Sequence, residues 1–160
     1  MQGLIEEVIG LLHDKNMLVV TAESCTGGKI SAALTDIAGA SKVFERGYVV
    51  YSNRAKVEVL GVSERLLEQH GAVSAEIAIE MAQRAIFASH AKLAVSCTGI
   101  AGPGGATPEK RVGTVFIAIA YGHNPPKVFA HNFRGDREDV RNQATEQAFL
   151  HIRDALQEEA

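Results

Sequence analysis

The chain has 160 residues, a length that suits one domain, and we expect residues 1–160 to form a single domain. Its 46% hydrophobic and 22% charged residues are typical of a globular protein, and the near balance of 16 basic and 19 acidic side chains argues against a general nucleic-acid binder. No apolar run approaches the ~20 residues of a membrane span. The only cysteines, Cys25 and Cys97, are too few for a disulfide framework and lack a metal-ligand spacing. We therefore expect a cytoplasmic protein with no nucleic-acid or membrane partner.

The first half of the chain alternates helical and strand patterns. In order, the pattern predicts a helix over residues 4–12, a strand over 17–20, a helix over 29–34, a strand over 43–51, a short helix over 53–60, a turn over 63–71 and a long helix from 74 to about 90. Gly47 is expected to mark a bulge in the second strand. Ser74 is the expected N-cap of the long helix.

The second half contains two adjacent strand patterns and a final helix. It predicts a strand over residues 92–99, a glycine-rich loop over 99–108, strands over 113–120 and 127–133, and a helix from Asp136 to Leu156. The six-residue connection favours antiparallel pairing of the last two strands. The whole order predicts an α/β fold, a three-layer α/β/α sandwich around a mixed sheet of about five strands.

Two similar segments end two of the predicted strands. Residues 21–28 read Thr-Ala-Glu-Ser-Cys-Thr-Gly-Gly and lead into a helix, and residues 96–99 repeat Ser-Cys-Thr-Gly. A helix that starts at such a tip presents free N–H groups that suit a phosphate or an oxyanion. Ser or Thr at this place is also an ordinary N-cap. If their strands are parallel in the sheet, the two tips are neighbours at one edge, where ligands bind in α/β sheets.

Known cofactor and metal motifs are absent from the sequence. The glycines do not follow the dinucleotide or P-loop patterns, no nucleophile elbow surrounds a serine, and the six histidines are scattered. We expect no metal and no cofactor. A hydroxyl nucleophile paired with lysine remains, a known way to activate serine without histidine.

The motifs together resemble the CinA C-terminal domain family. The resemblance rests on residues 21–28, on residues 44–56 (Phe-Glu-Arg-Gly-Tyr-Val-Val-Tyr-Ser-Asn-Arg-Ala-Lys), on Gly-Ala-Val-Ser at 71–74 and on Gly-Ile-Ala-Gly-Pro at 99–103. Many members are nicotinamide-nucleotide amidases, which hydrolyse nicotinamide mononucleotide to nicotinate mononucleotide and ammonia in pyridine-nucleotide salvage. The resemblance implies this activity here, with a small-molecule nucleotide as substrate.

The resemblance also implies site residues. Ser24 corresponds to the family's nucleophile and Lys56 to its base, with Tyr51 beside them. Lys56 must then have a lowered pKa, for which we consider desolvation or the positive charges of Arg46, Arg54 and the substrate's pyridinium ring. The residues expected to bind the substrate or its oxyanion are Thr26, Gly27, Gly28, Thr98, Gly99, Gly102 and Arg111, with Lys110 and Thr107 as alternatives for the phosphate.

Several alternatives stay open at this stage. Thr98 and Ser96 could equally make simple loop hydrogen bonds, and Glu23 could orient Lys56, bind a ribose hydroxyl or cap a helix. Adjacent side chains of a strand point to opposite faces, so only one of Ser24 and Cys25 should face the cleft. The alternative function is a non-catalytic nucleotide-sensing or protein-interaction module. Exposed edge strands and the small size are compatible with a homodimer.

Overall fold

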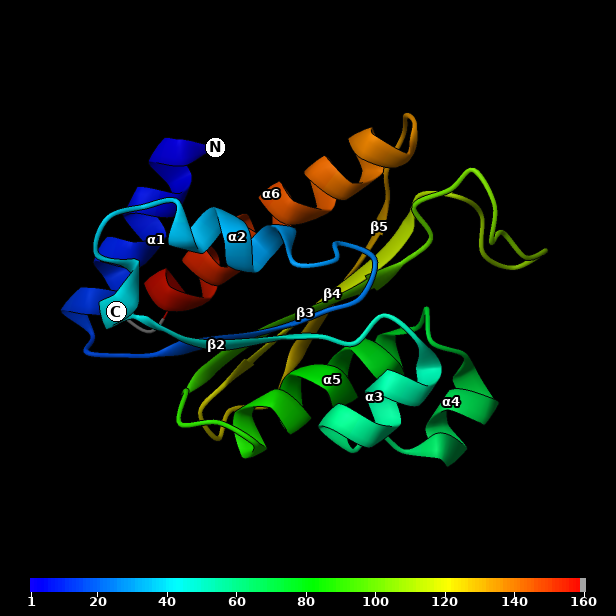
Figure 1. The fold of residues 1–160 in the computed structure, drawn as a ribbon, viewed down its shortest axis with the longest axis horizontal. Coiled ribbons are helices and arrows are strands. Elements are labelled where there is room, and N and C mark those ends of the chain that lie inside the picture. Colours follow the sequence, from blue (N-terminus) through cyan, green and yellow to red (C-terminus); the bar gives the residue numbers. More distant parts are fainter. Residues whose placement is uncertain (159–160) are drawn as a thin grey trace.

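The computed structural model describes residues 1–158, so the last two residues of the expected domain lie outside it. Five strands form one sheet in the order β2-β1-β3-β4-β5 (Figure 1). The strands are β1 (Val19–Glu23), β2 (Phe44–Val49), β3 (Leu93–Gly99), β4 (Thr114–Tyr121) and β5 (Lys127–Asn132). β1 runs parallel to both β2 and β3, whereas β4 is antiparallel to β3 and β5. The mixed five-stranded sheet and the antiparallel last pair are therefore confirmed.

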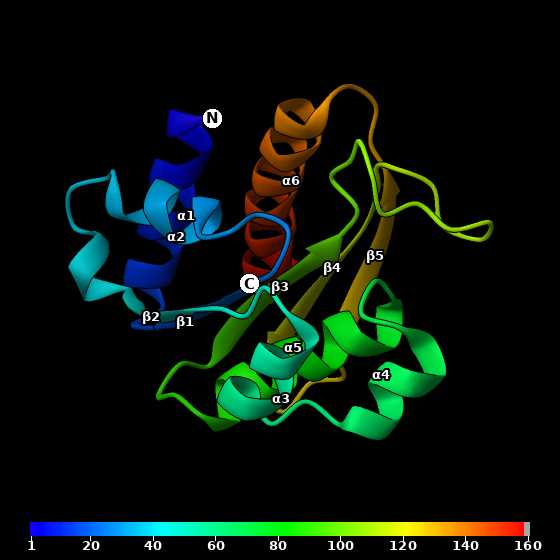
Figure 2. The ribbon, with the colours of Figure 1, turned by 45° about the vertical axis from the view of Figure 1, so that its right-hand side comes forward.

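Helices cover both faces of the sheet. They are α1 (Gln2–Asp14), α2 (Lys29–Thr35), α3 (Asn53–Leu60), α4 (Glu64–His70), α5 (Ala75–Phe87) and α6 (Arg137–Glu158), with a short 3-10 helix η1 (Ala40–Lys42). α1, α2 and α6 lie on one face and α3, α4 and α5 on the other (Figures 1 and 2). The predicted three-layer α/β/α sandwich is confirmed. No helix within residues 1–158 is both long and apolar enough to cross a membrane.

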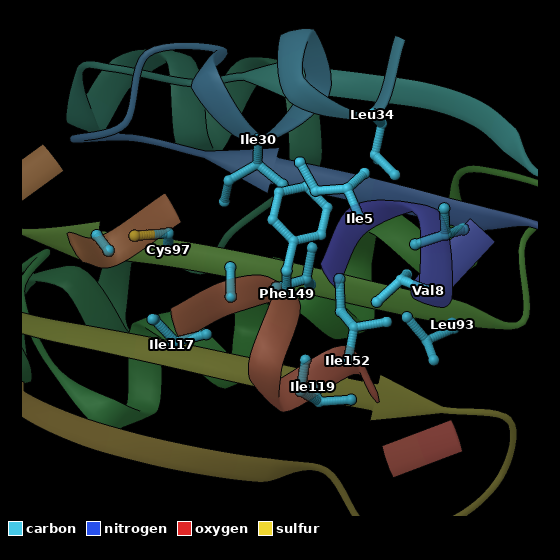
Figure 3. Close-up of a cluster of buried hydrophobic side chains, with 14 of the residues drawn as sticks. Ile5, Val8, Ile30, Leu34, Leu93, Cys97, Ile117, Ile119, Phe149 and Ile152 are labelled. Carbon is cyan, nitrogen blue, oxygen red and sulfur yellow. The ribbon is translucent and has the colours of Figure 1, made fainter. Parts of the chain in front are cut away.

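Two apolar clusters hold the layers together. On the α6 face, Phe149 and Ile152 pack with Ile5 of α1 and Ile30 of α2 over the sheet (Figure 3). On the other face, small residues of α5 pack against alanines of the sheet, which lets this helix approach the strands closely. The apolar pattern of the sequence accounts for both clusters, because the buried residues of α1, α5 and α6 recur at helical spacing.

Two local expectations were wrong. Residues 63–71 were expected to be a turn, but residues 64–70 form α4, whose N-cap Ser63 accepts a hydrogen bond from the N–H of Leu66. This helix buries no residue fully, so it lacks a clear apolar stripe in the sequence. The irregularity in β2 lies at Glu45, which is skipped in the pairing with β1, and not at Gly47. Gly47 instead allows close approach, because a Cβ atom there would lie 2.6 Å from the Thr21 and Ser31 hydroxyl oxygens.

The caps explain where the longer helices begin. Ser74 caps α5 by accepting a hydrogen bond from the N–H of Ile77, as predicted. Asp136 accepts a hydrogen bond from the N–H of Asp139 at the start of α6. The α2 helix begins differently, because its N-cap residue is Gly28, which has no side chain to offer.

Glu23, the last residue of β1, takes over the role of capping α2. Its carboxylate is fully buried and accepts hydrogen bonds from the N–H groups of Gly28, Ile30 and Ser31. It also accepts from the hydroxyls of Thr26 and Ser31. A negative charge at a helix N-terminus is favourable, and several donors offset the cost of burying it. Of the three roles considered for Glu23, the contacts favour that of a helix cap.

We predict that Glu23→Gln lowers the free energy of unfolding by about 2–3 kcal/mol, because one acceptor oxygen becomes a donor that faces other donors. Urea unfolding followed by circular dichroism measures this change. Glu68→Gln, at an exposed position of α4, is the control and should leave the midpoint unchanged. Equal stability of the wild type and Glu23→Gln would contradict the assigned role.

Candidate active site

A pocket lies where the ends of β1, β2 and β3 meet the start of α6. Its volume is about 300 Å³, and it is lined by Ser24, Cys25, Tyr51, Asn53, Lys56, Ala72, Val73, Thr98, Gly99, Ile100, Ala101, Gly102, Gly104, Gly105 and Arg137. The two Ser-Cys-Thr-Gly tips are neighbours here, because β1 and β3 are parallel and adjacent. A larger hollow of about 560 Å³ lies between α1 and residues 36–42, but no Ser, Thr or Cys lines it. The smaller pocket is therefore the better candidate for a catalytic site, because side chains that can act as nucleophiles line it.

Ser24 and Lys56 meet at the floor of this pocket. Lys56 Nζ donates a hydrogen bond of 3.0 Å to Ser24 Oγ, and Ser24 is 7% exposed. The lysine comes from α3, which follows β2 after a short connection, and the serine follows β1 directly. Lys56 Nζ also contacts the carbonyl oxygens of Val50 at 3.0 Å and Tyr51 at 3.3 Å. The structure thus brings together the two residues that the sequence pairs only through a family resemblance.

Burial gives Lys56 an unusual acid–base character. The side chain is 1% exposed, and desolvation lowers the pKa of its amine from 10.5 to about 8. The charges of Arg46 and Arg54, which we considered as causes, are directed elsewhere. Arg46 binds Glu45, and Arg54 lies 3.8 Å from Glu58. Lys56 can therefore lose its proton near neutral pH because water is excluded from it, and not because of a neighbouring cation.

Ser24 and Cys25 make different contacts. The Ser24 hydroxyl meets Lys56, whereas the Cys25 sulfur lies 3.6 Å from the sulfur of Cys97 and belongs to the apolar cluster beneath α6. Cys25 still reaches the wall of the pocket. Of the two adjacent side chains, only the serine contacts a group that can act as its base.

The residues after Cys25 do not line the pocket. Thr26 is fully buried, and its hydroxyl donates to Glu23. The N–H of Gly27 bonds to the carbonyl of Ser24, and the N–H of Gly28 bonds to Glu23. These groups, expected to hold an oxyanion, are thus engaged within the chain. The sequence contains a sign of this arrangement, because the carboxylate of Glu23 can accept the hydrogen bonds of the N-terminus of α2 that an oxyanion would otherwise accept.

The second tip contributes a wall and part of a loop. Thr98 lines the pocket while its hydroxyl donates to the carbonyl of Ala72, and Ser96 donates to the carbonyl of Ala78. Gly99 and Gly102 also line the pocket. A Cβ atom on Gly99 would lie 2.8 Å from the Thr114 carbonyl oxygen, so only glycine fits. The loop over residues 100–113 extends beyond the strand ends (Figures 1 and 2).

Arg137 is a pocket residue that the sequence reasoning missed. It is the first residue of α6, and its guanidinium donates to the carbonyl of Gly102 at 2.9 Å and to the Tyr51 hydroxyl at 3.0 Å. Tyr51 is 60% exposed and lines the pocket. Arg111, the cation expected near the phosphate, instead lines a different pocket next to Arg134. Lys110 donates to the carbonyl of His70.

Arg141, one turn further along α6, was also missed. Its Nε donates to the carbonyl of Cys25 and its Nη2 to the carbonyl of Thr26, both at 3.0 Å. The guanidinium therefore holds the Cys25–Thr26 and Thr26–Gly27 peptide units, which begin one residue after Ser24. Nothing in the local sequence distinguishes Arg137 and Arg141 from other helix arginines, because their partners lie far away in the chain.

Within residues 1–158, no group of three or more His, Cys, Asp or Glu side chains is arranged to hold a metal ion. The chemistry available in the pocket is that of a buried hydroxyl and an amine whose pKa is about 8. Such a pair can act as nucleophile and base toward an acyl carbon.

Comparisons with known proteins place nearly the whole chain in one family. The family model of the CinA C-terminal domain matches residues 1–156. The nicotinamide-nucleotide amidohydrolase PncC of Shigella flexneri is 50% identical over 142 residues, which are 89% of this chain and 86% of the relative. A CinA-like protein of Geotalea daltonii is 52% identical over 84% of this chain, but the match spans only 32% of that longer relative.

Solved structures show the same fold. The competence/damage inducible protein CihA of Agrobacterium tumefaciens has a TM-score of 0.94 at 39% identity, covering 98% of this chain and 94% of that one. A CinA superfamily protein of Klebsiella pneumoniae also has a TM-score of 0.94, at 32% identity with 98% of each chain covered. From the match over nearly its whole length, this chain belongs to the CinA C-terminal domain family.

Proposed function

We propose that the protein is a nicotinamide-nucleotide amidase that converts nicotinamide mononucleotide to nicotinate mononucleotide and ammonia. The hydrogen bond between Lys56 Nζ and Ser24 Oγ inside a pocket carries the proposal. The relative of Shigella flexneri is named a nicotinamide-nucleotide amidohydrolase, and its match covers most of both chains, which supports this choice of substrate. A module that only binds nucleotides does not need a buried amine on a serine hydroxyl.

Ser24 and Lys56 perform the first half of the reaction. Neutral Lys56 takes the hydroxyl proton as Ser24 Oγ attacks the carboxamide carbon. The negative charge then moves to the carboxamide oxygen. We assign the role of oxyanion donor to the N–H of Cys25, the residue after the nucleophile. Arg141 supports the next peptide unit by donating to the carbonyl of Cys25. The C–N bond breaks when protonated Lys56 gives its proton to the nitrogen, and ammonia leaves.

The second half returns the enzyme to its starting state. Water attacks the acyl carbon of the Ser24 ester while neutral Lys56 accepts a proton from it. The bond to Ser24 Oγ breaks, Lys56 returns the proton to Ser24, and the product leaves as a carboxylate. No step needs a metal or a cofactor.

The remainder of the pocket fits the rest of the nucleotide. Arg137 lies at its exposed side and offers a guanidinium that suits a phosphate. The exposed ring of Tyr51 lies next to Arg137 and offers an aromatic face to the cationic pyridine ring. A substrate with its carboxamide on Ser24 would then extend toward the start of α6.

The direct test is ammonia release from nicotinamide mononucleotide by the purified protein with a chelator present. We expect equal amounts of ammonia and nicotinate mononucleotide. Binding of the nucleotide without turnover would favour the non-catalytic alternative, and activity lost to the chelator and restored by a metal would exclude the proposed chemistry.

We predict that Ser24→Ala and Lys56→Met each reduce kcat by at least about 1,000-fold, with a double mutant little worse than either, because residues that act as a unit are not additive. Lys92→Met, at an exposed position, is the matched control and should keep full activity. Steady-state kinetics on folded variants measure these effects. A Ser24→Ala variant with normal turnover would remove the serine from the mechanism.

The pH dependence should follow Lys56. Its amine must be neutral to accept the serine proton, and its pKa is about 8. We expect kcat/KM to fall about tenfold per pH unit below that pKa. A pH–rate profile gives the pKa below which kcat/KM falls. A value of 6 or lower would assign the role of base to another group.

The same pKa can be measured without the reaction. Burial lowers the pKa of Lys56 from 10.5 to about 8, so between these values the unfolded chain binds the proton more readily than the folded one. The free energy of unfolding of the wild type, relative to Lys56→Met, should therefore rise by about 3 kcal/mol from pH 8 to pH 10.5. Urea unfolding at several pH values shows this rise, and parallel curves would contradict the lowered pKa.

Arg137 should act on substrate binding. We predict that Arg137→Met raises the KM for nicotinamide mononucleotide about 10- to 100-fold with a smaller change in kcat, because a charged hydrogen bond to phosphate is lost. Arg134→Met is the matched control, since Arg134 is exposed beside a different pocket. The riboside, which lacks the phosphate, should not distinguish Arg137→Met from the wild type, and an equal loss on both substrates would count against this role.

A further inference from the structure

We propose that Cys25 and Cys97 form an oxidisable pair in which a peroxide converts the two thiols to a disulfide that disables Ser24. The two sulfurs are already in contact at 3.6 Å. These are the only cysteines of the chain, and each lies in one of the two Ser-Cys-Thr-Gly tips. The effect on Ser24 rests on the proposed function, whereas formation of the disulfide does not.

The sheet places the two cysteines within reach of a bond. β1 and β3 are parallel neighbours with Glu23 opposite Cys97, and the N–H of Ser24 donates to the carbonyl of Cys97 at 2.9 Å. Cys25 follows directly. A disulfide has an S–S length of about 2.05 Å, so the sulfurs must close by about 1.5 Å. Rotation of the two side chains with a small shift of the tip supplies such a movement.

The two thiols have unequal roles. Cys25 reaches the wall of the pocket, so a small neutral oxidant can meet it there. Cys97 is fully buried within the apolar cluster (Figure 3). The hydrogen bond from Cys97 lowers the pKa of the Cys25 thiol, while this contact and burial raise the pKa of Cys97. Cys25 is thus the thiolate that reacts first, and Cys97 is the thiol that resolves the product.

The chemistry balances with hydrogen peroxide as the oxidant. The Cys25 thiolate attacks one peroxide oxygen, the O–O bond breaks, and hydroxide leaves, so that Cys25 becomes a sulfenic acid. The sulfur of Cys97 then displaces the sulfenic oxygen, and this oxygen leaves as water with the thiol proton. Two thiols are oxidised, and the peroxide is reduced to two molecules of water.

The disulfide would act on the neighbouring nucleophile. Cys25 is bonded to Ser24, whose hydroxyl must stay 3.0 Å from Lys56 Nζ. A displacement of about 1 Å at a reacting group costs on the order of 100-fold in rate. We therefore expect peroxide to lower amidase activity by at least about tenfold, and a dithiol reductant to restore it.

The test treats the full-length protein with hydrogen peroxide and follows three properties. Intact mass under non-reducing conditions should fall by two hydrogen atoms, and alkylation after unfolding should find no free thiol. Turnover of nicotinamide mononucleotide should fall and recover with dithiothreitol. Labelling of Ser24 by a fluorophosphonate should fall in parallel, which reports the serine without reference to the natural substrate.

Cys97→Ala is the matched variant, because it removes the resolving thiol without touching the pocket. It should keep basal activity, show no loss of two hydrogens and instead gain oxygen on Cys25. Two free thiols in the treated wild type, or a disulfide form with undiminished Ser24 labelling, would overturn the proposal. If the untreated protein does not release ammonia, the proposed function fails. The intact mass then still tests whether the disulfide forms, and labelling of Ser24 still tests whether it affects the serine.

Discussion

The site depends on one buried amine. Lys56 is almost completely excluded from water, and its hydrogen bonds go to neutral oxygens of Ser24, Val50 and Tyr51. An ammonium group in such a place loses hydration that these oxygens only partly replace, so the neutral amine becomes accessible near physiological pH. The fold produces this environment by placing α3 a short connection after β2, so that Lys56 Nζ contacts the carbonyls of Val50 and Tyr51 within that connection.

Two further charged side chains keep the serine tip in position. Glu23 accepts hydrogen bonds from the amides at the start of α2, while Arg141 of α6 donates hydrogen bonds to the carbonyls of Cys25 and Thr26. The tip is therefore fixed through both its donors and its acceptors. Such support by residues that do not touch a substrate is what a preorganised nucleophile requires.

Much of the fold followed from the sequence, because the layers rest on long periodic patterns. The apolar stripes of α1, α5 and α6 and the paired strands β4 and β5 were predictable for this reason. The short α4 was not, since it buries no residue fully. For the site, the pairing of Ser24 with Lys56 came from the resemblance and not from spacing, and only the structure shows their contact.

The arginines illustrate the limit of sequence reasoning more sharply. Arg111 follows a glycine-rich loop and was expected to bind an anion, but it lines a different pocket, next to Arg134. Arg137 begins a helix after a long separation from the tips, and its place next to Tyr51 is a property of the sheet order. Local sequence carries no information on such long-range contacts.

The position of β2 has a consequence for how the molecule loses activity. Within residues 1–158, β2 is an edge strand that pairs with β1 alone, and the two residues that follow it, Val50 and Tyr51, supply carbonyls that accept hydrogen bonds from Lys56. Edge elements open locally at a lower free energy than the centre of a sheet. Brief detachment of this strand would hydrate the lysine and separate it from the serine while β3, β4 and both apolar clusters remain intact. The proposed catalytic centre is thus less stable than the fold around it, and we expect inactivation by heat to precede global unfolding.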